Sequence, residues 1–214
     1  MAEGQSVAYA SEAGTPLIAD PGYDLALAAR EAGYEVTTAP GVSAVITALS
    51  LAGLPTDRFL FEGFLPNSAS QRKTALREIA GVQATLVFYE SPKRVAAMLR
   101  DAAEVLGPDR EAALCRELTK KFEEFIRGDT EEILEILADK KFKGEFVVLI
   151  EGIDEKQLSD QTWTGEKLDT LLSKAMGNMN MSVKDAAAYA AKESGQPKRK
   201  LYARAVILSK NGLV

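Results

Sequence analysis

Residues 11–16, Ser-Glu-Ala-Gly-Thr-Pro, decide the fold together with Asp-Pro-Gly at 20–22 and Pro-Gly-Val-Ser-Ala at 40–44. The first and last of these turns each follow a short apolar segment. Turns rich in Pro and Gly directly after strands are how an α/β sheet builds a small-molecule pocket at the carboxyl ends of its strands. The alternative is a plain tight connection, because Gly and Pro are common in all loops.

The first 40 residues have the pattern of a strand, a helix and a strand. Residues 7–10 and 35–38 are the expected strands, and residues 22–33 are the expected helix. A second helix of small residues is expected at 43–52. A unit of this size cannot cover both faces of its own sheet, so it needs further strands. We therefore expect the chain to be part of a larger protein.

The composition fits one or two globular domains. The chain has 214 residues, 46% of them hydrophobic, which is enough to build a core. No apolar run approaches the ~20 residues of a membrane helix, and no signal peptide marks the start. The sequence therefore predicts a cytoplasmic protein without membrane contact.

The chain contains no histidine and one cysteine, Cys115, which lies in an apolar run. Catalysis by Ser-His-Asp or Cys-His groups and zinc bound through histidine are therefore excluded. No metal site is predicted, since only a hard ion held by carboxylates would suit this composition. Chemistry must depend on positioning, on carboxylate, Lys or Tyr groups, or on a bound cofactor.

The middle of the chain predicts a mixed sheet with helices on its surface. The strands and helices alternate, and the last strand is rich in β-branched residues. Strands are expected at 59–61, 84–89, 112–116, 122–127 and 145–151, and helices at 69–80, 91–106 and 131–138.

The C-terminal part predicts a separate basic module of three helices, at 165–176, 182–192 and 198–209. Residues 184–210 carry seven Lys and Arg against two acidic residues, whereas the whole chain has a net charge of −5. Charged side chains beside an aromatic ring favour RNA binding, although a solvated helix face has the same pattern. The candidates for RNA contact are Lys198, Arg199, Lys200, Tyr202 and Arg204.

Polar residues follow two of the expected buried strands. Glu90 and Arg94 come after the strand at 84–89, and a run from Arg116 to Lys121 comes after the strand at 112–116. They are either a solvated rim with surface ion pairs or a polar floor for an anionic substrate.

Several motifs in a fixed order resemble the ribosomal RNA small subunit methyltransferase I family, within the tetrapyrrole methylases. They are Ser-Glu-Ala-Gly-Thr-Pro-Leu-Ile-Ala-Asp-Pro-Gly-Tyr at 11–23, Pro-Gly-x-Ser-Ala at 40–44, Ala-Gly-Leu-Pro-Thr-Asp-Arg-Phe at 52–59, Glu-Gly-Phe-Leu-Pro at 62–66, Phe-Tyr-Glu-Ser-Pro-x-Arg at 88–94, Arg-Glu-Leu-Thr-Lys at 116–120 and Lys-Gly-Glu-Phe-Val-Val-Leu-Ile-Glu-Gly at 143–152.

The resemblance implies an α/β fold of two domains with the cofactor between them. It implies S-adenosylmethionine as cofactor, the ribose 2′-oxygen of a cytidine in the decoding region of 16S rRNA as substrate, and a homodimer. By resemblance, residues 1–53 are the remnant of an incomplete N-terminal cofactor-binding domain with its linker, and 54–152 are the C-terminal α/β domain. Residues 153–164 are then a linker, and 165–214 a small helical C-terminal extension.

The resemblance also assigns site residues. Cofactor contacts are expected from Ser11, Glu12, Ala13, Gly14, Thr15, Pro16, Ser43, Ala44, Tyr89, Glu90, Arg116, Leu118, Glu145 and Phe146. Glu90 and Glu117 are the candidate bases that take the hydroxyl proton, with Lys120 as a third catalytic residue. Arg94, Lys120 and Lys121 are further RNA-binding candidates.

Two departures from the family pattern matter. Family members more often have Asp where this chain has Glu12, which still serves as an acceptor. The family's first strand, its glycine-containing turn and an Asp-Thr-Arg segment have no counterpart here. We therefore expect the chain alone to bind the cofactor weakly and to turn over little. The alternatives are a tetrapyrrole-type small-molecule methylase and a non-catalytic RNA-binding or dimerisation module.

Overall fold

The computed structural model describes residues 2–11, 13–138, 142–154, 158 and 163–210. The chain divides into two compact units, residues 1–152 and 153–214, which are described separately.

The first unit contains a mixed five-stranded sheet with the order β1-β2-β5-β3-β4. Its strands are β1 (Phe59–Phe64), β2 (Thr85–Glu90), β3 (Glu111–Arg116), β4 (Glu124–Asp129) and β5 (Phe146–Ile150). β1 and β2 are parallel, and β5 is antiparallel to both β2 and β3. The carboxyl ends of β1, β2 and β3 therefore lie at one edge of the sheet, here called the strand-end edge, with the amino ends of β4 and β5.

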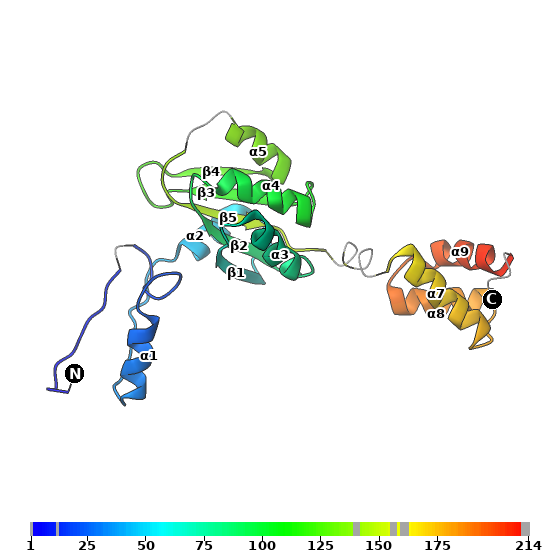
Figure 1. Cartoon of the computed structure of the whole chain (residues 1–214), viewed down its shortest axis with the longest axis horizontal. Helices are drawn as coiled ribbons and strands as arrows, with labels where there is room; N and C mark the ends of the chain where they lie inside the picture. Colours follow the sequence, from blue (N-terminus) through cyan, green and yellow to red (C-terminus); the bar gives the residue numbers. More distant parts are fainter. Residues whose placement is uncertain (1, 12, 139–141, 155–157, 159–162, 211–214) are drawn as a thin grey trace. The chain divides into compact units, whose positions relative to one another are not determined.

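Helices cover both faces of this sheet (Figure 1). Helices α3 (Ala69–Ile79), α4 (Val95–Leu106) and α5 (Thr130–Ala138) bury one face, where Met98 and Leu99 share a core with Phe88 and Val148. Helix α2 (Ala44–Ala52) packs on the other face, where its small residues meet those of the strands. The expected strands and helices of this region are all present, with bounds shifted by a few residues.

Strands were expected at 7–10 and 35–38, and this prediction is wrong for the described structure, in which neither segment is in a strand. A strand needs a neighbour for its N–H and C=O groups, and no described segment pairs with either of these. The expected helix is present as α1 (Tyr23–Glu31). Apolar side chains of this region, such as Val7 and Leu25, lie exposed.

The second unit is a bundle of three helices, α7 (Gly165–Gly177), α8 (Val183–Ser194) and α9 (Lys198–Lys210). Ser182 caps α8 by accepting a hydrogen bond from the Asp185 N–H, and Gly195 ends it in the left-handed conformation. Small residues of α8 pack between Leu172 and Leu201 of its neighbours. A short turn with Gly between two packed helices is the arrangement of a helix-turn-helix motif.

Among the described residues, no helix has both the length and the apolar character needed to span a membrane.

Candidate functional site at the strand-end edge

The strand-end edge brings together side chains that are far apart in the sequence. Tyr89 and Glu90 end β2, and their cross-strand partners on β5 are Val147 and Phe146. Phe146 is also the partner of Arg116, the last residue of β3. The predicted cofactor contacts Tyr89, Glu90, Arg116 and Phe146 therefore lie together on the adjacent strands β2, β5 and β3.

Three charged side chains form a connected group at the centre of this edge, from the loop after β3 and the start of β5. Lys120 Nζ lies 3.1 Å from Glu117 Oε1 and 3.0 Å from Glu145 Oε2. Glu117 Oε1 also accepts a hydrogen bond of 3.0 Å from the Glu145 N–H. We call Glu117, Lys120 and Glu145 the acid–lysine group.

The backbone around the acid–lysine group is strained in a way that holds Glu117 in place. Glu117 has φ = 50° and Thr119 has φ = 64°, values that non-glycine residues rarely adopt. Gly144 has φ = 96°, and a Cβ atom there would overlap the Glu117 side chain. Strain of this kind persists only where the surrounding structure holds it, often at functional sites.

Hydrogen bonds within the acid–lysine group determine the protonation states of its side chains. The N–H of Glu145, followed by Lys120, lowers the pKa of Glu117 below its ordinary value. Hydrogen bonds to Glu145 and then to Glu117 raise the pKa of Lys120. Glu117 is therefore a carboxylate and Lys120 an ammonium group at neutral pH, and both carry partners already.

Tyr89 connects this group to the start of α2. The Val45 N–H donates a hydrogen bond to the Tyr89 phenol oxygen, while burial, followed by the negative charge of Glu145, raises the pKa of the phenol. Ser43 is the N-cap residue of α2 but makes no capping hydrogen bond with its side chain. Ala44, next along, packs against the same core.

The turn at 11–16 lies beside the turn at 40–44. Thr15 Oγ1 donates a hydrogen bond of 3.0 Å to the Val42 carbonyl, and Thr15 is also the nearest neighbour of Gly41. Ser11 donates to the Ala13 carbonyl within the first turn. Gly14 and Pro16 belong to the same turn, whereas the predicted contact Glu12 lies outside the described residues. The structure therefore brings both predicted turns to the start of α2.

The other predicted cofactor contacts at this edge already interact with other parts of the protein. Arg116 pairs with Glu124 at 3.0 Å and donates to the Lys143 carbonyl at 3.1 Å. Leu118 packs against the α2 face of the core. Phe146 is buried on the opposite face. Any ligand contact from Phe146 would therefore come from its backbone.

The buried Glu90 and the half-buried Arg94 form an ion pair rather than an open polar floor. Glu90 is only 3% exposed, accepts a hydrogen bond from the Ser91 N–H, and lies 3.1 Å from Arg94 in an ion pair. Arg94 in turn donates to the Leu65 carbonyl at 2.6 Å and to the Asn67 side chain. These contacts fix the loop after β1.

A second arginine holds the same loop from the other side. Arg72 of α3 donates to the carbonyls of Pro66 and Asn67 at 3.3 and 3.0 Å. Its guanidinium lies 2.6 Å from Asp101 of α4, and both residues are buried. This role of Arg72 has no signal in the sequence, because a basic residue in an amphipathic helix has the same pattern whether it forms a buried ion pair or faces solvent.

The RNA-binding candidates differ in how much of each side chain is available. Lys121 is exposed, as are Tyr202 and the three basic residues 198–200 at the start of α9. Arg204 instead pairs with both carboxylate oxygens of Asp169 and donates to the Gly165 carbonyl, which ties α9 to α7. Its guanidinium is used within the helical unit.

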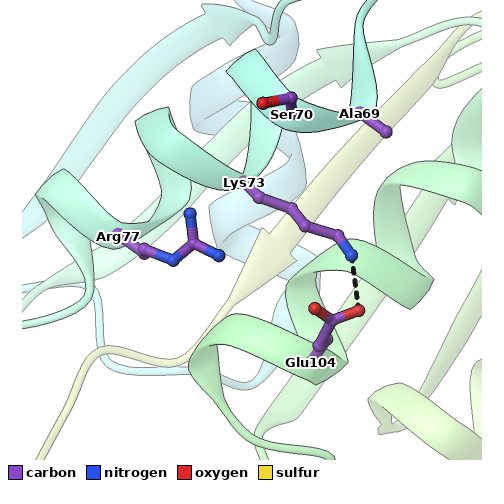
Figure 2. Close-up of a pocket in the computed structure, with 5 residues that line it drawn as sticks. All are labelled: Ala69, Ser70, Lys73, Arg77 and Glu104. Atoms are coloured by element: carbon purple, nitrogen blue, oxygen red, sulfur yellow. Dashed lines mark hydrogen bonds and ion pairs between the residues drawn. The ribbon is translucent and has the colours of Figure 1, made fainter.

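A hollow of about 370 Å³ lies between α3 and α4 (Figure 2). Lys73 points across it to Glu104, with Nζ 2.5 Å from Oε2, and this hydrogen bond raises the pKa of Lys73. Arg77 lines the same hollow. None of the residues predicted to bind cofactor or RNA lines this hollow, so it is a weaker candidate than the strand-end edge.

Comparisons with known proteins agree with this architecture. The family model described as tetrapyrrole (corrin/porphyrin) methylases matches residues 1–134, and the model of the RsmI C-terminal HTH domain matches residues 164–209. Among solved structures, the methyltransferase CobJ superposes with a TM-score of 0.50 at 22% identity, covering 65% of this chain and 62% of CobJ. A conserved hypothetical protein of Aeropyrum pernix also gives 0.50, at 19% identity, covering 94% of this chain and 68% of its own. The fold is therefore that of the tetrapyrrole methylases.

Curated relatives narrow the class. Proteins named ribosomal RNA small subunit methyltransferase I are 40% identical in Halalkalibacterium halodurans, 43% in Escherichia coli O157:H7 and 50% in Vibrio cholerae. These matches cover 94%, 94% and 74% of this chain, and 69%, 68% and 57% of the relatives' own lengths. The chain belongs to the ribosomal RNA small subunit methyltransferase I family.

Proposed function

We propose that this chain, together with the part of its relatives that it does not span, carries out S-adenosylmethionine-dependent methylation of the 2′-oxygen of a cytidine ribose in the decoding region of 16S rRNA, and that it turns over little alone. Family membership is the observation that carries the proposal. The gathering of the expected cofactor residues at the strand-end edge supports it. The chain spans 57% to 69% of the relatives' lengths given above, so the activity of the whole protein is inferred from them.

The polar and apolar groups at the edge fit a charged nucleoside cofactor. The Glu145 side chain is 81% exposed and has an ordinary carboxylate's capacity to accept from hydroxyl or ammonium groups. Ala44 and Leu118 offer apolar surface nearby, and the Ser43 hydroxyl is not used as a cap. At Gly41, an added Cβ would have only Thr15 close by, so the backbone there is approachable.

When bound, S-adenosylmethionine supplies a methyl group already activated by its sulfonium. The protein's task is then to hold the ribose hydroxyl in line with that methyl group, since alignment alone lowers such barriers by several kcal/mol. Lys120 holds the carboxylates of Glu117 and Glu145 in one position on the edge. We assign Glu117 as the acceptor of the hydroxyl proton and Lys120 as the residue that orients the Glu117 carboxylate.

Glu90, the other candidate base, is assigned a positioning role. A general base must lie within hydrogen-bond reach of the proton it takes. Glu90 is buried and faces Arg94, so it reaches no substrate without breaking that pair. Arg94 likewise serves the loop at 65–67 rather than RNA.

On the RNA side, we assign phosphate contacts to Lys121 and to residues 198–200, with Tyr202 available for stacking. All of them are exposed in their own units. We also propose a homodimer, which sedimentation of the purified chain will test.

The test is transfer of tritium from labelled S-adenosylmethionine to small ribosomal subunits that lack the modification. The chain is assayed alone and joined to the part of the E. coli relative that lies outside the matched region. Glu117→Gln and Lys120→Met should lower kcat in the active form by about 10²-fold or more. Glu111→Gln is the matched control, because Glu111 begins β3, the strand that ends just before Glu117.

Two outcomes would refute the proposal. Label in a corrin precursor instead of the ribosomal subunit would establish the small-molecule methylase. Salt-sensitive RNA binding with no transfer in either form would establish a binding module.

A further inference from the structure

An irregularity in β1 turns Phe64 to an unexpected face of the sheet. Phe61 pairs with Val87 and Gly63 with Phe88, so Glu62 is an extra residue in the register. Gly63 adopts φ = 64°, which suits glycine at a β-bulge. Without the extra residue, alternation would send Phe64 to the face covered by α3 and α4. The bulge instead places it on the α2 face, opposite Tyr89.

On that face Phe64 belongs to a row of three aromatic rings. The Phe61 and Tyr89 ring centroids lie 4.9 Å apart, and those of Tyr89 and Phe64 lie 5.8 Å apart, both with edge-on geometry. Phe61 and Tyr89 are part of the α2-face core, whereas Phe64 is 58% exposed. The row therefore runs from the core out to the strand-end edge and ends in an open ring.

The chain directly after Phe64 is held rigidly. Arg94 and Arg72 together bind the carbonyls of residues 65–67, and each arginine is anchored by a buried carboxylate, Glu90 and Asp101 respectively. A ring fixed in advance loses little conformational freedom when a ligand packs on it. Neither the family resemblance nor the acid–lysine group explains why the chain beside one exposed ring is held so firmly.

The same edge carries a second exposed aromatic ring beside a cation. Phe122, in the loop between β3 and β4, is 63% exposed, and Lys121 Nζ lies 5.7 Å from its centroid. Exposed rings with lysines between them are how proteins bind unpaired nucleotides, because every base has a face that stacks. A base inside a duplex offers no such face.

We propose that Phe64 is a stacking platform for an unpaired base of the RNA strand that lies along the strand-end edge. The inference rests on the proposed function, which supplies RNA as the ligand. It adds a residue that contacts an unpaired base, whereas the acid–lysine group is assigned to the ribose. Stacking of this kind contributes about 1–3 kcal/mol per base, or about 5-fold to 100-fold in affinity.

The test measures binding of the full chain to a short single-stranded RNA that carries the fluorescent base pyrrolo-cytosine. Phe64→Ala should weaken binding by about 5-fold to 100-fold and abolish the quenching that stacking causes. Phe64→Trp should retain both. Phe59→Ala is the matched control, because Phe59 is 43% exposed at the other end of the same strand and should change neither.

A second probe separates stacking from other effects. An RNA with an abasic site at the fluorescent position should bind the wild-type chain and Phe64→Ala equally, and calorimetry should give equal S-adenosylmethionine affinity for the two. Equal binding of the intact probe, or equal losses on both probes, would overturn the inference alone. A shift of Phe64→Ala to a smaller sedimenting species would assign the ring to an interface between two copies and would also overturn it. Absence of RNA binding by the wild-type chain would overturn the proposed function and this inference with it.

Discussion

The buried pair between Arg72 and Asp101 gives a stability prediction with a large expected magnitude. Arg72→Ala leaves Asp101 buried between α3 and α4, with Lys73 Nζ at 3.6 Å as its remaining cation. Removing one partner of a buried ion pair costs about 3–5 kcal/mol, because the other charge loses its compensation. With a urea m-value of about 2 kcal/mol/M, the midpoint of unfolding should fall by about 2 M.

A second variant shows whether charge is the cause. Arg72→Met combined with Asp101→Leu removes both charges and should recover most of the loss, since apolar replacement of a buried pair is often neutral. A residual loss of about 1–2 kcal/mol should remain, because the carbonyls of Pro66 and Asn67 lose their donor. A cost below about 1 kcal/mol for Arg72→Ala, or a double variant no more stable than the single one, would refute the buried charge as the cause.

The helical unit supplies an internal control. Arg204 and Asp169 form a comparable pair, but their side chains are 38% and 36% exposed, so Arg204→Ala should cost no more than about 1 kcal/mol. Trp163, the only tryptophan in the chain, packs against the core of this unit and reports its unfolding by fluorescence. Arg72→Ala should shift the transition followed by circular dichroism and leave the Trp163 transition in place.

Four further predictions concern individual residues or, in the last case, one short basic segment. Gly144→Ala should displace the Glu117 side chain and lower methyl transfer together with stability by about 1 kcal/mol or more, as urea melts and tritium transfer will show. Because the pKa of Glu117 is lowered in the folded chain, its stabilising effect is complete above the unfolded-state pKa and is lost as the pH falls through the folded-state value. Glu117→Gln should therefore flatten the stability curve between about pH 5 and pH 3, measured by urea melts. Burial, followed by the charge of Glu123, raises the pKa of Cys115 to about 12, so iodoacetamide should modify it only in denaturant, as mass spectrometry will detect. Replacing residues 198–200 by Ala should reduce the salt slope of RNA binding by about 2, and an unchanged slope would exclude phosphate contacts there.

The sheet was predictable from the sequence because its central strands are buried on both faces. β2 and β5 are continuous apolar runs, a pattern that few other structures produce. The N-terminal strands were not predictable in the same way, since residues 7–10 have strand composition but pair with nothing described. Strand propensity is realised only where a neighbouring backbone completes the ladder.

The candidate site was predictable in its membership but not in its connections. Glu117 and Lys120 were expected from their position after the strand at 112–116, whereas Glu145 was expected from the family resemblance. That Lys120 joins both carboxylates depends on the left-handed turn at Glu117 and Thr119, which no residue type there indicates. The bulge in β1 was indicated in the sequence by one feature, its glycine, because a glycine within a strand pattern often marks an irregular register.

The two candidate bases differ in what their surroundings permit. Both carboxylates follow parallel strands, and sequence position alone does not separate them. Glu90 ends β2 inside the core, where its charge is met by Arg94 and the Ser91 N–H, and Arg94 in turn holds the loop that follows Phe64. Glu117 lies one residue beyond β3, outside the sheet core, where its carboxylate binds Lys120 and remains next to the open edge. One carboxylate therefore fixes the wall of the site, and the other is the one that the proposed function assigns to the ribose hydroxyl.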